Sequence, residues 1–138
     1  MNDCIFCKII NGEIPTEKIY EDDDTFVFAD ISPVNLGHSL VLPKKHYRNI
    51  FDLPPELFAK MELIAQKIAK VLKENLAADG VNIHMNNEEA AGQVVFHAHL
   101  HVIPRYKNDG FTYWHGPKRS AEEIKEASEK IRSVILKP

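Results

Sequence analysis

The sequence predicts an α+β fold in which an antiparallel sheet of about five strands packs with a central helix and a C-terminal helix. Two patterns predict it: short runs rich in β-branched and aromatic residues, and two longer runs with apolar residues at every third or fourth position. The chain has 138 residues, of which 44% are hydrophobic, enough for one core and too few for two. We therefore expect a single domain over residues 1–138.

The strand-like runs are separated by turn residues. They lie within residues 18–31, 38–43, 81–85 and 94–104. The first of these ranges holds two runs around the acidic cluster 21–24, which favours a hairpin. The next run ends at Pro43, because proline cannot donate a hydrogen bond to a sheet ladder. The last two flank the polar loop 86–93, and we expect them to pair as neighbours.

Two segments have helical periodicity. Between Pro54 and Leu76, one face of the expected helix is apolar and carries Leu57, Met61, Ile64, Ile68 and Leu72. Gly80 is expected to mark the exit from this helix. The second helix begins after Ser120 and Glu123, which have capping-box spacing, and continues to the C-terminus through Ile124, Ala127, Ile131 and Ile135.

Composition excludes several classes of protein. A net charge of -3 and a pI near 6.1 give no general attraction to nucleic acid or to anionic membranes, so any phosphate recognition must be local. The N-terminus does not read as a signal peptide, and no apolar run approaches the ~20 residues needed to span a bilayer. Two cysteines three positions apart exclude a long-range disulfide framework and suit a reducing compartment. We expect a cytoplasmic protein.

Three histidines alternate with apolar residues near the end of the sheet region. In a strand, His97, His99 and His101 would all lie on one face. A neutral imidazole can act as a nucleophile, a base or a metal ligand. The residues alone leave three interpretations: an ordinary half-exposed strand, a catalytic zinc bound by the three imidazoles, or a nucleophilic site.

The motif around these histidines resembles the signature of the histidine-triad family. Besides FHAHLHVIP at 96–104, the resemblance rests on CIFCKIINGEIP at 4–15, FADISPVNLGHSLVLPKKH at 28–46 and Gly92-Gln93. It covers roughly residues 4–106 and leaves a C-terminal extension with a helix, 107–138. It implies a fold like that of the family, a purine nucleotide substrate and a homodimer built by pairing a helix and a strand across a two-fold axis.

The resemblance also implies a mechanism. His99 attacks the α-phosphorus of a nucleoside phosphoramidate, an adenylate or a dinucleoside polyphosphate, and water releases the nucleotide from the resulting nucleotidyl-histidine. His101 and His38 support this chemistry, and no catalytic metal is required. The implied nucleotide-binding residues are Phe6, Ile9, Phe28, Asp30, Ile31, Leu40, Asn86, Gln93, Val94, His99 and His101.

Within that set, Asp30 would bind the ribose, and backbone N–H groups around Gln93 and Val94 would bind phosphate oxygens. Val94 departs from many relatives, which have serine or threonine there. The departure favours an alternative, a catalytically weak nucleotide-binding signalling protein. A zinc-dependent hydrolase is the third function considered.

The C-x-x-C pair Cys4 and Cys7 has the spacing of half a zinc site. A thioredoxin-like redox pair and two unligated thiols are the alternatives. The resemblance implies the other two ligands, because bacterial relatives with this pair complete the site with histidines at the positions of His46 and His97. Four protein ligands would fill the coordination shell of zinc and make the ion structural.

Overall fold

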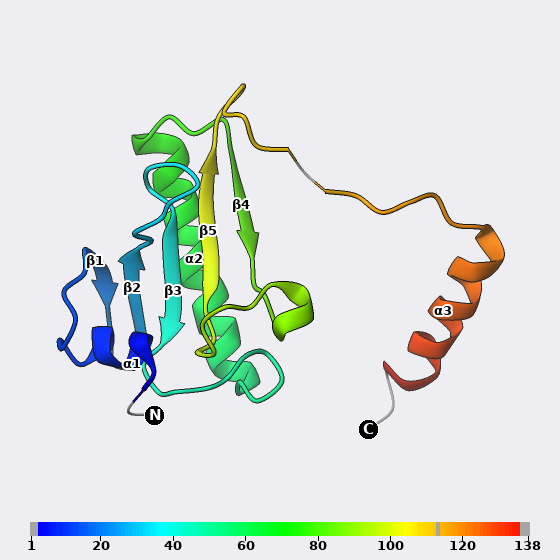
Figure 1. The fold of residues 1–138 in the computed structure, drawn as a ribbon, viewed down its shortest axis with the longest axis horizontal. Coiled ribbons are helices and arrows are strands. Elements are labelled where there is room, and N and C mark those ends of the chain that lie inside the picture. The colour runs from blue at the N-terminus through cyan, green and yellow to red at the C-terminus, as the bar shows by residue number, and fades with distance from the viewer. Residues whose placement is uncertain (1–2, 113, 136–138) are drawn as a thin grey trace.

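The structure is a computed structural model that describes residues 3–112 and 114–135. It contains a five-stranded antiparallel sheet with the strand order β1-β2-β3-β5-β4 (Figure 1). The strands are β1 (Lys18–Glu21), β2 (Thr25–Ala29), β3 (Ser39–Pro43), β4 (Gly80–His84) and β5 (Leu100–Arg105). The helices are α1 (Ile5–Ile10), α2 (Pro55–Asn75), the 3-10 turn η1 (Glu89–Ala91) and α3 (Ala121–Ile135). The predicted fold class is confirmed.

The acidic cluster forms the turn of the predicted β1-β2 hairpin. One carboxylate oxygen of Asp22 accepts hydrogen bonds from the backbone N–H of Asp24 at 2.9 Å and from the N–H and hydroxyl of Thr25 at 2.8 Å each. A short acidic side chain that binds backbone N–H groups two and three residues ahead is a common way to close a tight turn. The acidic residues here therefore shape the chain.

The central strands are buried on both faces. On one face, α2 packs Met61, Ala65 and Leu72 against side chains of β3 and β5, among them Val41 and Leu100. The opposite face carries Phe26, Phe28, Leu40 and Leu42 together with Phe6 and Ile9 of α1. Successive residues of a strand point to opposite faces, so β2 and β3 each contribute to both clusters. The short helix α1 was not predicted, and it covers the face that α2 leaves open.

The histidine segment departs from the predicted strand. The prediction of a strand from residue 94 is wrong for residues 94–99, because β5 begins only at Leu100. Before that point the chain is held by other contacts, including a hydrogen bond of 2.7 Å from the N–H of Ala98 to the carbonyl of Tyr47. The pairing of the last two strands is confirmed, with His84 of β4 opposite His101 of β5. Gly80 is the first residue of β4, and α2 ends earlier, at Asn75.

The helix α3 lies apart from the sheet. Ser120 and Glu123 form the predicted capping box, with reciprocal hydrogen bonds of 3.0 and 3.1 Å. Figure 1 shows α3 beyond the β4 edge of the sheet, at the end of an extended connection. The helix was expected to reach the C-terminus, and its last positions, 136–138, lie outside the described residues. No helix in the described part of the chain is both long and apolar enough to cross a membrane.

The packing of α2 generates a stability prediction. Met61 is fully buried between α2 and the sheet, so Met61→Ala should lower the free energy of unfolding by about 2–5 kcal/mol through lost burial and a residual cavity. Leu63 lies on the same helix with 61% of its side chain exposed, and Leu63→Ala should change that free energy by less than about 0.5 kcal/mol. Urea unfolding followed by circular dichroism measures both. Equal losses in the two variants would contradict this assignment of the core.

Candidate active site and metal centre

A cavity of about 620 Å³ opens on the face of the sheet that α1 covers. Its walls come from α1, β2, β3, the loop before β5 and β5 itself. Ten of the eleven residues predicted to bind nucleotide line it: Phe6, Ile9, Phe28, Asp30, Ile31, Leu40, Asn86, Val94, His99 and His101. Its size is in the range of small-molecule sites, and its lining joins apolar side chains to a few convergent polar groups.

His99 has one ring nitrogen fixed by the backbone. Its Nδ1 lies 2.6 Å from the carbonyl oxygen of His97, and a carbonyl can only accept, so Nδ1 carries the proton. The Nε2 lone pair is then available at the cavity. The ring is buried and meets Phe6 edge-on, with 5.0 Å between the ring centroids. Burial lowers the pKa of His99 and favours the neutral, nucleophilic form.

The tautomer of His101 follows from a chain of hydrogen bonds. The backbone N–H of Val34 donates to Nδ1 of His38 at 3.1 Å, so a neutral His38 must carry its proton on Nε2. That Nε2–H lies 2.9 Å from Nδ1 of His101, which therefore accepts. A neutral His101 must then carry its own proton on Nε2. His99 thus offers a lone pair and His101 a proton.

Asp30 lies beside His38 in this chain of hydrogen bonds. Its Oδ1 accepts a hydrogen bond from the N–H of Ser32 at 2.8 Å, and its Oδ2 lies 3.5 Å from Nε2 of His38. The carboxylate is thereby oriented at the cavity wall. Ligand atoms of Asp30, His38 and His101 lie within 4.8 Å of one another, but the direct hydrogen bond between the two rings occupies the Nδ1 lone pair of His101.

Several residues at the site were missed by the sequence analysis, among them His84 and Thr16. The ring of His84 stacks on the ring of His101, with centroids 4.7 Å apart and planes inclined by 25°. The predicted pairing of β4 with β5 indicated that residues of the two strands would be neighbours. Which residues face each other depends on the strand register, and the register places His84 opposite His101. Thr16 also lines the cavity, and its buried hydroxyl has no hydrogen-bond partner within the described residues. Nothing in the sequence around Thr16 pointed to it.

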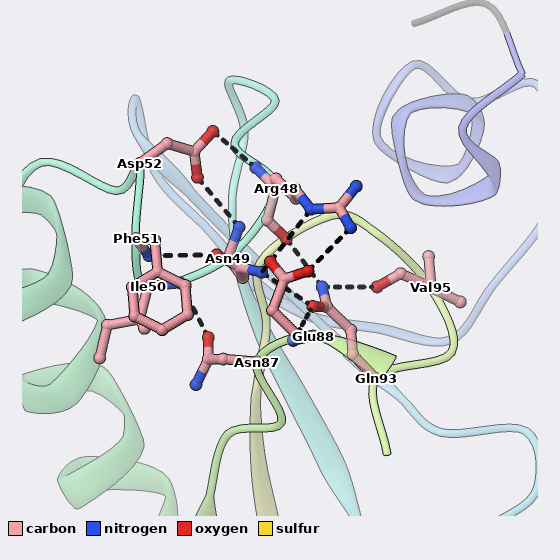
Figure 2. A network of polar contacts seen from close by, with 9 residues as sticks. All are labelled: Arg48, Asn49, Ile50, Phe51, Asp52, Asn87, Glu88, Gln93 and Val95. Carbon is pink, nitrogen blue, oxygen red and sulfur yellow. Dashed lines mark hydrogen bonds and ion pairs between the residues drawn. The ribbon is translucent and has the colours of Figure 1, made fainter. Parts of the chain in front are cut away.

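Gln93 is the predicted residue that does not line the cavity. Figure 2 shows its side chain inside a polar network that connects the loop before β5 to residues 48–52. Its amide nitrogen donates to the carbonyls of Arg48 and Val95, and its amide oxygen accepts from Asn49 and from the N–H of Glu88. The side chain is fully engaged, and the backbone N–H of Gln93 is engaged as well, because it donates to the carbonyl of Glu88 at 3.2 Å.

Arg48 and Glu88 form the outer part of the same network. The guanidinium of Arg48 donates to both carboxylate oxygens of Glu88, at 3.1 and 2.9 Å. A two-point contact of this kind fixes orientation as well as distance. Glu88 itself has a φ of 76°, a left-handed conformation that L-residues rarely adopt, so the network holds the loop in a shape the backbone alone disfavours.

The two cysteines and two other histidines form a separate cluster, as predicted. Ligand atoms of Cys4, Cys7, His46 and His97 lie within 4.8 Å of one another. Nδ1 of His97 is 3.5 Å from each sulfur, and Nδ1 of His46 is 3.5 Å from the sulfur of Cys7. Nε2 of His97 lies 2.8 Å from the carbonyl of Pro43 and must donate to it, which leaves the Nδ1 lone pair toward the sulfurs.

This donor set fits a zinc ion. Two thiolates and two imidazoles are a common tetrahedral set for structural zinc. Burial raises the pKa of the Cys7 thiol to about 11, with a further contribution from the neighbouring Cys4, and a divalent cation would reverse this effect. Because His97 belongs to this cluster, the three triad imidazoles do not share one ion, which argues against the zinc-hydrolase interpretation.

Comparisons with known proteins agree with this geometry. The family model "HIT domain" matches residues 11–108. Adenylylsulfatase HINT3 of Arabidopsis thaliana is 40% identical over 134 residues, which cover 96% of this chain and 68% of that protein. The crystal structure of SMU.412c from Streptococcus mutans UA159 superposes with a TM-score of 0.90 at 43% identity, covering 98% of this chain and 87% of that one.

A zinc-bound histidine triad family protein from Mycobacterium smegmatis superposes with a TM-score of 0.77 at 41% identity, covering 96% of this chain and 97% of that one. The family match spans most of the chain, and His99 and His101 lie together in one cavity beside a separate cysteine-histidine cluster. The chain therefore belongs to the histidine-triad (HIT) family.

Proposed function

We propose that this protein is a nucleotide hydrolase or nucleotidyl transferase that cleaves at the α-phosphate of nucleoside phosphoramidates, adenylates or dinucleoside polyphosphates. The observation that carries the proposal is the fixed pair of tautomers at the cavity, a lone pair on His99 and a proton on His101. Their rings are neighbours, with centroids 5.0 Å apart. A nucleophile and a hydrogen-bond donor to the phosphate on one face suit displacement at phosphorus.

The reaction has two balanced steps. Nε2 of His99 forms a bond to the α-phosphorus while the bond from phosphorus to the leaving group breaks, and the leaving group takes a proton from solvent. The Nε2–H of His101 donates a hydrogen bond to the phosphate. A water molecule then attacks phosphorus and returns a proton to solvent, and the bond to His99 breaks. The products are a nucleoside monophosphate and the protonated leaving group. His38 keeps His101 in the donating tautomer throughout.

The predicted binding roles follow the cavity wall. The base would lie among Phe6, Ile9, Phe28, Ile31 and Leu40, and the ribose hydroxyls would bind Asp30. Asn86 and the backbone around Gln93 and Val94 would contact the phosphate. A purine nucleotide suits this largely apolar site, whose aromatic rings can pack against a flat base.

Val94 supports a second candidate function. Its side chain is 85% exposed at the cavity and carries no hydroxyl. A donor to the phosphate is missing there, which would weaken stabilisation of the transition state. A nucleotide-binding signalling protein with little turnover is therefore the alternative.

The cysteine-histidine cluster is proposed to hold a structural zinc ion. Cys4 and Cys7 are at the start of α1, which also carries Phe6 and Ile9 of the cavity, and His97 directly precedes the reactive segment. Such an ion would fix α1 against the segment that carries His99 and take no part in the displacement. We also propose that the protein forms a homodimer.

Loss of the nucleophile gives the first test of this function. His99→Ala should lower AMP formation from adenosine phosphoramidate and from a diadenosine polyphosphate on the order of 10³-fold or more, as expected when a covalent nucleophile is removed. The wild type should need no free metal ion, so the assay uses buffer depleted of free metal. His115→Ala, an exposed histidine outside the cavity lining, is the matched control and should keep full activity. Nucleotide binding without turnover by the wild type would instead favour the signalling alternative.

Zinc content tests the role of the second cluster. The wild type should bind one zinc ion per chain, and Cys4→Ser with Cys7→Ser should abolish that binding, because serine hydroxyls are poor zinc ligands. A chelator should lower the Tm of the wild type and leave that of the double variant unchanged. Metal analysis and thermal unfolding with and without chelator measure both effects. Full zinc binding by the double variant would contradict the assignment.

The tautomer of His101 can be observed directly. Burial, with smaller contributions from the neighbouring His99, His84 and His38, lowers the pKa of His101 from its ordinary value near 6.5 to about 3. A lowered pKa keeps a histidine neutral at pH values between the two, so the ring should remain neutral with its proton on Nε2 at pH 5. Long-range proton–nitrogen NMR correlations report both properties. Titration of His101 near pH 6.5, or a proton on its Nδ1, would contradict the assigned tautomer.

A further inference from the structure

The helix α3 has an apolar face that its own chain leaves uncovered. Ile124, Ile131, Val134 and Ile135 are each more than half exposed, and with Ala127 they recur at helical spacing along one side. An isolated helix of fifteen residues is marginal in water, and an amphipathic helix of this length gains its stability by packing that face. The sequence therefore encodes a helix that needs a docking surface.

A second apolar surface of the chain is also uncovered. A groove of about 330 Å³ runs between α2 and the β1 side of the sheet, and we call it the α2 groove. Its lining includes Ile19, Tyr20, Ile68, Val71 and Leu76, and most of these side chains are exposed. It lies on the α2 side of the sheet, opposite the nucleotide cavity. A helix bound there would not compete with substrate.

The groove and the helix lie at opposite edges of the same molecule. Strands β1 and β4 are the two edges of the sheet, the groove adjoins β1, and Figure 1 shows α3 beyond β4. The superposition with the S. mutans structure, at a TM-score of 0.90, covers 98% of this chain and so includes residues of the C-terminal segment.

We propose that α3 of each chain docks in the α2 groove of a second copy, so that two chains exchange their C-terminal helices. Each chain offers one such helix and one such groove, which is the condition for a closed, two-fold symmetric exchange. A second copy placed along the open β4 edge would lie on the side to which α3 extends. The inference details the proposed homodimer and is independent of the proposed reaction.

The charges of the groove and of α3, and the length of the connection before α3, agree with docking of α3 in the groove of a second copy. The charged residue on the groove wall is Lys67, and Glu123 borders the apolar face of α3. The helix carries four glutamates against three cationic residues: Glu122, Glu123, Glu126 and Glu129 against Lys125, Lys130 and Arg132. Hydrogen bonds hold the chain in a turn up to Asp109. The connection from residue 110 to 120 can extend to about 36 Å at the usual rise of an extended chain, enough to reach a neighbouring subunit. Figure 1 shows the described residues of this connection, up to 112 and from 114, without helix or strand.

A mixing experiment tests the exchange. Val71→Glu blocks the groove and keeps a normal α3, and Ile131→Glu blocks α3 and keeps a normal groove. Each variant alone should dimerise at least tenfold more weakly than the wild type, as measured by sedimentation equilibrium. Mixed at equal concentration, they can rebuild one intact contact, so native mass spectrometry should find more heterodimer than the statistical half of all dimers.

Matched controls and contrary outcomes complete the design. Ser133→Glu, on the polar side of α3, should leave dimerisation unchanged, and circular dichroism with nucleotide binding confirms that each variant is folded. A wild-type monomer, variants that dimerise as tightly as the wild type, or a purely statistical mixture would each overturn the proposal. A monomer destabilised by both substitutions would show instead that α3 binds its own groove. Turnover by the wild type is measured separately, so failure of the proposed reaction would not be confused with failure of the exchange.

Discussion

The fold and the site meet at His97. Its ring donates to the carbonyl of Pro43 at the end of β3, which turns Nδ1 toward the two cysteines, while its own carbonyl accepts the Nδ1 proton of His99. One buried residue thereby joins the sheet, the cysteine-histidine cluster and the reactive ring. Without these hydrogen bonds, each of the ring nitrogens and carbonyl oxygens involved would be a buried polar atom without a partner, at a cost of about 1–3 kcal/mol. The geometry of the cavity depends on this junction.

The two faces of the sheet have different roles, one in forming the core and the other in forming the cavity. The side covered by α2 is a conventional apolar core, and the side covered by α1 combines an aromatic cluster with the cavity that contains His99 and His101. Because side chains alternate along a strand, the same short strands β2 and β3 serve both sides. A rigid two-sided layer lets His38, His84 and His101 lie on three neighbouring segments at fixed separations, as their ring contacts require.

The sequence predicted features set by local periodicity. The five strands, the α2 helix and the capping box of α3 follow from spacing and turn residues, and the alternation of His99 and His101 placed them on one face. The sequence did not predict that β5 begins only at Leu100, because the contacts of His97 with Pro43 and the cysteines join residues that are distant along the chain. The six-residue α1 is too short to show a period and is capped by the sulfur of Cys4. The stacking of His84 depends on strand register, and the engagement of Gln93 depends on Arg48 and Asn49, forty or more residues away.

The position of α1 would couple the proposed metal ion and the proposed nucleotide through thermodynamic linkage. One end of this helix bears Cys4 and Cys7 of the ion cluster, and its buried side bears Phe6 and Ile9 of the nucleotide cavity. Fixing a short helix in place has an entropic cost. The ligand that binds first would bear this cost, so the second ligand would bind to a helix that is already fixed. Metal and nucleotide should then raise each other's affinity by the same factor, because such coupling is reciprocal. A change in the concentration of available metal would therefore change the fraction of chains that have nucleotide bound in the cavity.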